Sequence, residues 1–105
     1  MWTVLLTEEA AGELDGLPDD QKARFARIRG LIQEHGLERV RFPHVRHLKG
    51  SLWEIRLKGA DGISRALYVV ATGRRVVVVR VFTKKTQKTP AREIELALKR
   101  AKDVT

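Results

Sequence analysis

The chain has 105 residues, and its 21 Lys and Arg residues against 13 Asp and Glu residues give a net charge of +8. This length predicts a single domain over residues 1–105 with one core. The absence of cysteine excludes a disulfide framework, a thiolate metal site and a cysteine nucleophile. No apolar run approaches the ~20 residues of a transmembrane helix. No signal peptide is recognisable either, so the sequence predicts a cytoplasmic protein.

The charge is unevenly distributed. Residues 1–38 carry 4 basic and 8 acidic residues, a net of −4, whereas residues 39–105 carry 17 basic and 5 acidic residues, a net of +12. A segment this basic favours a polyanion as its partner, and nucleic acid is the first to consider. The alternative is a basic surface that only keeps the protein soluble.

The acidic third predicts a strand and two helices. Trp2–Leu6 is a short apolar run typical of a strand. Thr7 can cap a helix that begins at Glu8 and ends at Gly16, and Pro18 begins a second helix that ends at Gly36. Residues at helical spacing mark the buried face of this second helix: Phe25, Ile28, Leu31, Ile32 and His35.

After a break at Phe42-Pro43, the period changes from helical to strand-like. Three strands are predicted, separated by turns at Asp61-Gly62 and Thr72-Gly73: Leu52–Lys58, Ile63–Ala71 and Arg74–Phe82. The last contains four consecutive valines, which favours a central strand covered on both faces. A final helix begins at Thr89-Pro90 and has an apolar stripe through Ala101. The order β-α-α-β-β-β-α predicts an α+β fold with an antiparallel sheet packed against helices.

Cations gather on the predicted sheet. Residues on one face of neighbouring antiparallel strands lie ~5 Å apart at their Cβ atoms. Arg56, Arg65 and the pair Lys84-Lys85 can therefore line one surface, and Glu54 and His47 are acid–base candidates in the same stretch. Further cations are expected to contact RNA outside this group: Lys49, Lys58, Arg80 and Lys88.

Such a surface suits cleavage of RNA without a metal ion. The ribose 2′-OH attacks the adjacent phosphorus, and fixed Arg and Lys donors stabilise the charge that grows on the phosphate oxygens. A lysine crowded by other cations can exchange a proton near neutral pH. His44 and His47 lie three residues apart but have no third ligand at metal-site spacing, so no metal cofactor is predicted.

The sequence resembles the RelE/HigB toxin superfamily, in its phage-derived HigB-like branch. The resemblance covers almost the whole chain, and its most specific part is the run Phe82-Thr83-Lys84-Lys85-Thr86-Gln87-Lys88-Thr89-Pro90, followed by Ile94-Glu95-Leu96-Ala97. It implies a compact RelE-like fold and a type II toxin that cleaves mRNA, typically in the ribosomal A site. The implied partner is a cognate antitoxin, commonly a helix-turn-helix protein encoded by the adjacent gene.

By position, Arg56, Arg65, Lys84 and Lys85 match the family's basic residues and carry the implied role of binding the scissile phosphate. The sequence departs from RelE proper at Glu54, which stands where that branch has a lysine, and its final helix has no tyrosine. Glu54 is either a general base or an ion-pair partner of Arg56. A basic module that keeps the fold without catalysis, binding only RNA or an antitoxin, is the alternative function.

Overall fold

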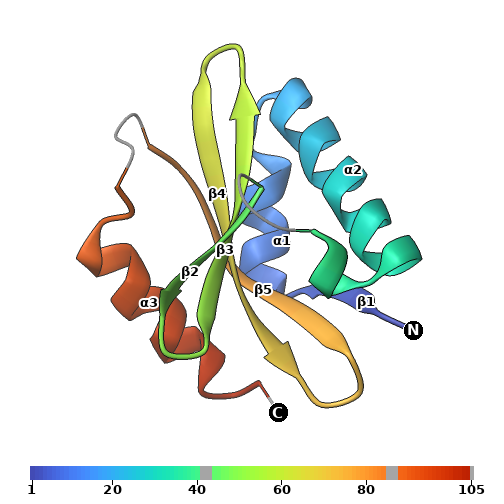
Figure 1. Cartoon of the computed structure of the whole chain (residues 1–105). Helices are drawn as coiled ribbons and strands as arrows, with labels where there is room; N and C mark the ends of the chain where they lie inside the picture. Colours follow the sequence, from blue (N-terminus) through green and yellow to red (C-terminus); the bar gives the residue numbers. More distant parts are fainter. Residues whose placement is uncertain (41–43, 85–87, 105) are drawn as a thin grey trace.

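The computed structural model describes residues 1–40, 44–84 and 88–104, with only the backbone described at Lys84. The elements follow in the order β1 (Thr3–Leu6), α1 (Glu8–Asp15), α2 (Asp19–His35), the 3-10 turn η1 (Leu37–Arg39), β2 (Val45–Lys49), β3 (Leu52–Gly59), β4 (Gly62–Ala71), β5 (Arg75–Lys84) and α3 (Ala91–Ala101). The strands form one sheet in the order β1-β5-β4-β3-β2. Helices α1 and α2 cover one face and α3 covers the other, as Figure 1 shows.

The predicted α+β class and the antiparallel meander β3-β4-β5 are confirmed. The predicted element order omits strand β2. This strand pairs with β3, but its sequence lacks the alternation of apolar and polar residues that predicts a strand. Strand β1 was expected, but it pairs in parallel with β5, so the sheet is mixed. The pairing of β1 with β5 joins segments that are far apart in the sequence, and strand periodicity does not specify such pairing.

Local signals set the helix ends as predicted. The Thr7 hydroxyl accepts a hydrogen bond from the Ala10 N–H at 3.2 Å and caps α1. Helix α2 ends before Gly36, whose φ of 94° suits glycine better than any residue with a Cβ. Within α2, Phe25 and Ile32 are buried against the sheet. His35, which shares their spacing, is exposed.

The valine run of β5 contributes to two cores. Val76 and Val78 pack with α1 and α2, whereas Val77 and Val79 belong to the cluster that includes Ala97 of α3. Strand residues alternate between faces, so one run of valines can fill both layers. This confirms the prediction of a strand covered on both sides.

Beyond the end of β1, side chains form the hydrogen bonds to the β5 backbone that a neighbouring strand would otherwise form. The Val79 carbonyl accepts a hydrogen bond from Arg100 at 2.9 Å, and the Val81 N–H donates to the Glu13 carboxylate at 3.0 Å. Glu13 also forms ion pairs with Arg80 at 2.6 Å and Arg100 at 3.0 Å. This network therefore ties α1, β5 and α3 together while it satisfies the backbone of the strand edge.

Replacing Glu13 with glutamine is expected to lower the free energy of unfolding by about 1–3 kcal/mol, because two arginines lose their shared carboxylate. Both arginine side chains are only about one-fifth exposed, so water compensates the loss incompletely. Urea denaturation measures the change. The exposed Glu95→Gln variant on α3 serves as the control, and an equal loss in that variant would contradict the role assigned to Glu13.

Candidate functional site

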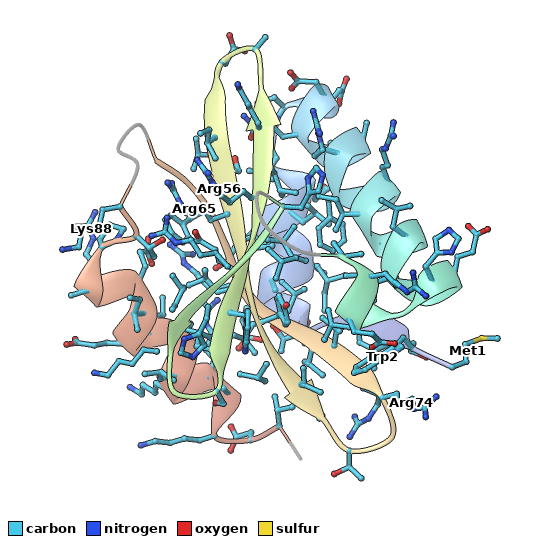
Figure 2. All side chains as sticks on the ribbon, in the orientation of Figure 1. Met1, Trp2, Arg56, Arg65, Arg74 and Lys88 are labelled. Carbon is cyan, nitrogen blue, oxygen red and sulfur yellow. The ribbon has the colours of Figure 1, made fainter. Side chains whose placement is uncertain are left out.

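Arg56 and Arg65 lie side by side on the face of the sheet that α3 covers in part. The register of β3 and β4 pairs their Cα atoms directly, so both side chains leave the same face. Figure 2 shows both residues on this side, with Lys88 near the start of α3. The expectation that strand alternation brings Arg56 and Arg65 together agrees with this register.

The Glu54 carboxylate organises this region from a fully buried position. Its Oε1 accepts a hydrogen bond from the Thr89 hydroxyl at 2.6 Å and lies 3.4 Å from the Arg65 Nε. Its Oε2 lies 3.9 Å from the Arg46 Nε and has no hydrogen bond to any described residue. One carboxylate thus joins β2, β3, β4 and the segment that precedes α3. Of the two roles expected for Glu54, the ion pair is present, but with Arg65 and Arg46.

The cluster of Arg46, Arg56, Arg65 and Glu54 carries excess positive charge. Three guanidinium groups against one carboxylate leave a net charge of +2. Burial lowers the pKa of Arg65 below its usual value; the Glu54 carboxylate opposes this, and the charges of Arg56 and Arg46 add to it. The Arg65 side chain is 0% exposed, so it cannot contact a ligand in this arrangement. Arg56, which is partly exposed, and Arg46, which is 42% exposed, can.

Lysine is the other cation expected at this site. The backbone of Lys84 pairs with Ile63 at the end of β5, and Lys85 lies outside the described residues. Lys58 is exposed at the end of β3, where it also pairs with Ile63, and Lys88 is exposed beside α3. The backbone positions of Lys58 and Lys84 therefore flank Ile63 from its two sides, at one end of the sheet.

Three expected site residues lie elsewhere. His47 pairs with Trp53, which places its side chain on the opposite face from Glu54. Its Nε2 lies 2.7 Å from the Gly50 carbonyl, and its ring contacts Trp53 edge-on, so His47 is no acid–base partner of the arginine cluster. Lys49 is exposed in the β2–β3 hairpin, at the other end of β3 from Lys58.

Arg80 is the third displaced residue. It forms ion pairs with Glu93 at 3.0 Å and with Glu13 at 2.6 Å, and it lies over the Phe82 ring at 5.7 Å. Hydrogen bonding to Glu93 raises the pKa of Arg80. These contacts make Arg80 part of the network along the β5 edge and leave it unsuited to the RNA contact expected from the sequence.

Sequence reasoning missed two members of the site, Arg46 and the Thr89 hydroxyl. Arg46 was missed because β2 was not predicted. Thr89 was assigned only to a helix start, and its hydrogen bond to Glu54 spans 35 positions. No local sequence pattern encodes either contact. A glutamate buried within a strand nevertheless needs charged or hydrogen-bonding partners, which other segments of the chain must supply.

Tyr68 lies on the α1 and α2 face of the sheet, away from the arginine cluster, and is 1% exposed. Burial raises the pKa of Tyr68 above its ordinary value. The unfolded chain ionises this tyrosine near about pH 10, earlier than the folded chain does. The free energy of unfolding is therefore expected to fall as pH rises above about 10. Urea denaturation at about pH 8 and about pH 11 should show a smaller fall in Tyr68→Phe than in the unmodified chain.

Two general features complete the description. Within the described ranges, no group of three or more metal-ligating His, Cys, Asp or Glu side chains occurs. No helix in the described part of the chain is long and apolar enough to cross a membrane.

The sequence and the fold both have known relatives. Residues 12–102 match the family described as phage-derived protein Gp49-like. The chain belongs to this Gp49-like family. This confirms the resemblance to the phage-derived branch of the RelE/HigB toxins. No curated protein sequence matches the chain closely enough to count as a relative.

Solved structures of toxin–antitoxin complexes share the fold of this Gp49-like protein. A chain of the archaeal RelE–RelB complex from Pyrococcus horikoshii aligns with a TM-score of 0.59 and 20% identity, covering 83% of this chain and 98% of that one. The intact RelBE complex of E. coli gives 0.55 and 15%, covering 82% and 100%. The RelBE2 complex of Mycobacterium tuberculosis gives 0.51 and 22%, covering 81% and 93%. The fold of the Gp49-like chain is therefore RelE-like.

Proposed function

We propose that this Gp49-like protein is the toxin of a type II toxin–antitoxin system and that it cleaves mRNA on the ribosome without a metal ion. The observation that supports this most directly is the pairing of Arg56 with Arg65 around the buried Glu54 carboxylate. A partly exposed guanidinium beside a second, buried one concentrates positive charge that can stabilise a phosphate group. The proposed site of action is the cytoplasm, where ribosomes and mRNA are found.

In the proposed reaction, the ribose 2′-OH attacks the adjacent phosphorus and the 5′-oxygen of the next nucleotide leaves. The attacking hydroxyl loses a proton and the leaving oxygen gains one, so the products are a 2′,3′-cyclic phosphate and a 5′-OH end. Arg56 donates to the phosphate oxygens as their charge grows, which lowers the barrier because the contact is stronger in the transition state. We expect Lys84 and Lys85, which follow Phe82 closely in the sequence, to add positive charge to this site.

Arg65 and Glu54 act as positioning residues in this proposal. Both side chains are 0% exposed, so neither reaches RNA directly. Glu54 fixes Arg65 at 3.4 Å, and Arg65 lies beside Arg56 in the strand register. A general base that is sealed from solvent and already accepts a hydrogen bond from Thr89 would have no access to the 2′-OH. The proton transfers are therefore assigned to groups other than Glu54 and His47.

Primer extension on an mRNA with purified ribosomes tests the proposal. New 5′ ends are expected in the presence of both the protein and ribosomes, and treatment of the protein alone with EDTA, which is then removed before the ribosomes are added, should not reduce them. A purely binding module would instead retain RNA in a salt-sensitive manner and produce no new ends. In cells, induction of the protein alone is expected to arrest growth.

The implied partner is an antitoxin, since the structural relatives are toxin–antitoxin complexes. We propose that it is a helix-turn-helix protein encoded by the adjacent gene. Co-expression of that gene product should restore growth and copurify with the toxin. Restoration of growth without copurification would contradict a direct complex.

A further inference from the structure

Arg46 extends the pair of arginines on β3 and β4 onto strand β2. The register of β2 and β3 places Arg46 directly opposite Glu54, so both side chains leave the same face of the sheet. Arg56 lies two positions after Glu54 on β3 and therefore shares that face. Arg46 and Arg56 are thus diagonal neighbours across the two strands, with their Cα atoms roughly 7–8 Å apart.

The Arg46 guanidinium keeps its hydrogen-bond donors available. Its Nε lies 3.9 Å from the Glu54 Oε2, a distance that gives an ion pair without a hydrogen bond, and this oxygen has no hydrogen bond to any described residue. The Arg46 side chain is 42% exposed, so a ligand can reach it. The Arg56 Nε likewise has no hydrogen-bond partner among the described residues. Two neighbouring guanidinium groups can therefore donate to one ligand.

Neutralisation of Glu54 does not account for Arg46. Arg65 lies closer to the carboxylate, at 3.4 Å, and Thr89 donates a hydrogen bond to it at 2.6 Å. Burial lowers the pKa of Arg65, Glu54 opposes this, and the two neighbouring arginine charges lower the pKa further. In the free protein Arg46 thus adds repulsion to the cluster, and negative charge on a ligand would offset that repulsion.

We propose that Arg46 binds the RNA phosphate next to the one that Arg56 binds, so that the two arginines contact two successive phosphates of one strand. Their separation across β2 and β3 is comparable to the spacing of neighbouring phosphates along an extended RNA strand. Arginine suits this contact because its planar group can donate two hydrogen bonds to one phosphate. The inference deepens the proposed function and rests on it for the identity of the bound strand.

Arg46 acts in binding, whereas Arg56 acts in the chemical step. The phosphate at Arg46 does not react, so its charge and its contact are the same in the ground state and in the transition state. Arg46 therefore raises the affinity for RNA without lowering the barrier of the bound complex. Two phosphate contacts also fix the direction in which the strand crosses the sheet, which one contact cannot do.

An acidic peptide is the other ligand that available guanidinium groups could attract. A nucleic acid fits better, because its charges follow one another at a fixed spacing that two fixed arginines can match. The net charge of +12 over residues 39–105 also favours a polyanion.

NMR titrations of the full chain with a thymidine dinucleotide and a thymidine trinucleotide, both without terminal phosphates, test the second contact. Neither probe can be cleaved, because each lacks the 2′-OH. The dinucleotide has one phosphate and the trinucleotide has two. Arg46→Gln should weaken trinucleotide binding about tenfold and dinucleotide binding no more than about twofold. For the trinucleotide, the slope of log Kd against log salt concentration should fall by about 0.7.

Two further variants serve as controls. Arg46→Lys keeps the positive charge and should bind the trinucleotide within about threefold of the unmodified chain. Arg74→Gln removes a charge from the β4–β5 hairpin and should bind both probes like the unmodified chain. A purely structural role of Arg46 would weaken the two probes equally. Equal losses for the two probes, an unchanged Kd in Arg46→Gln, or the same loss in Arg74→Gln would overturn the proposal.

Two competition and probe experiments need no variant. A trinucleotide in which one linkage is an uncharged methylphosphonate should bind the unmodified chain about tenfold more weakly than the trinucleotide with two phosphates. Equal affinity of these two probes would overturn the proposal. Displacement of the trinucleotide by an equal concentration of an oligoglutamate peptide of the same charge would do so as well, because the arginines would then bind any acid.

The outcomes separate this inference from the proposed function, since the binding measurements use neither ribosomes nor cleavage. Weaker trinucleotide binding in Arg46→Gln, together with no new mRNA ends from the unmodified chain, would support the phosphate contact and reject the nuclease. New mRNA ends, together with unchanged trinucleotide binding in Arg46→Gln, would support the nuclease and overturn the role of Arg46.

Discussion

Replacing Arg56 with glutamine is expected to lower the rate of ribosome-dependent mRNA cleavage by about 10²–10³-fold, the range for loss of one positioned donor to a developing anion. The reason is geometric. Arg56 is the partly exposed member of the pair with Arg65, so it is the member that can touch the phosphate. Single-turnover primer extension at saturating ribosome concentration measures the rate.

Arg74→Gln is the matched control for Arg56→Gln. It removes the same charge from an exposed residue at the tip of the β4–β5 hairpin, far from Arg56 in Figure 2. Its cleavage rate should stay within about twofold of the unmodified chain, because only net charge changes. Equal losses in the two variants would mean that overall charge, rather than a site, controls the reaction. An unchanged rate in Arg56→Gln would remove Arg56 from the mechanism.

Glu54→Gln is expected to lower the free energy of unfolding by about 3–5 kcal/mol, the cost of removing one charged member of a buried ion pair. Glutamine keeps the shape and can still accept the hydrogen bond from Thr89, but it leaves the fully buried Arg65 without a carboxylate. Urea denaturation measures the loss. The exposed Glu34→Gln variant on α2 should change stability by less than about 0.5 kcal/mol.

A double variant identifies Arg65 as the origin of the Glu54 effect. Replacing Arg65 with methionine in the Glu54→Gln background removes the buried guanidinium that Glu54 neutralises and should recover part of the lost stability. The two changes are then non-additive by about 0.5–3 kcal/mol, as expected for side chains in contact. Additive losses would show that Glu54 stabilises the fold independently of Arg65.

The sequence predicted the shared face of Arg56 and Arg65 because alternation along two antiparallel strands fixes which side chains are neighbours. It did not predict that Arg65 is buried, since burial of a charged side chain depends on tertiary contacts such as the ion pair with Glu54. It also placed His47 with the arginines. The sequence did not predict strand β2, so it could not show on which face of the sheet His47 lies. The register of β2 places His47 on the face opposite to the arginines.

In the fold, too, features set by local sequence patterns were predictable and features set by tertiary contacts were not. Thr7, Gly36 and the valines of β5 act through local rules of capping, turns and alternation, so their elements were predictable. The parallel pairing of β1 with β5 and the edge position of β2 were not, because both are set by contacts between distant segments. Tertiary contacts, not propensity, decide these features.

Glu13, Arg100 and Gln33 occupy backbone groups at one margin of the sheet, and this limits how copies of the protein can aggregate. Linear polymers built by strand addition need two open sheet edges on every molecule, one for each neighbour. Covering the backbone groups on the β1 and β5 side removes one of these two edges, so strand addition cannot continue from molecule to molecule. These side chains therefore protect a basic, strand-rich protein against fibre formation.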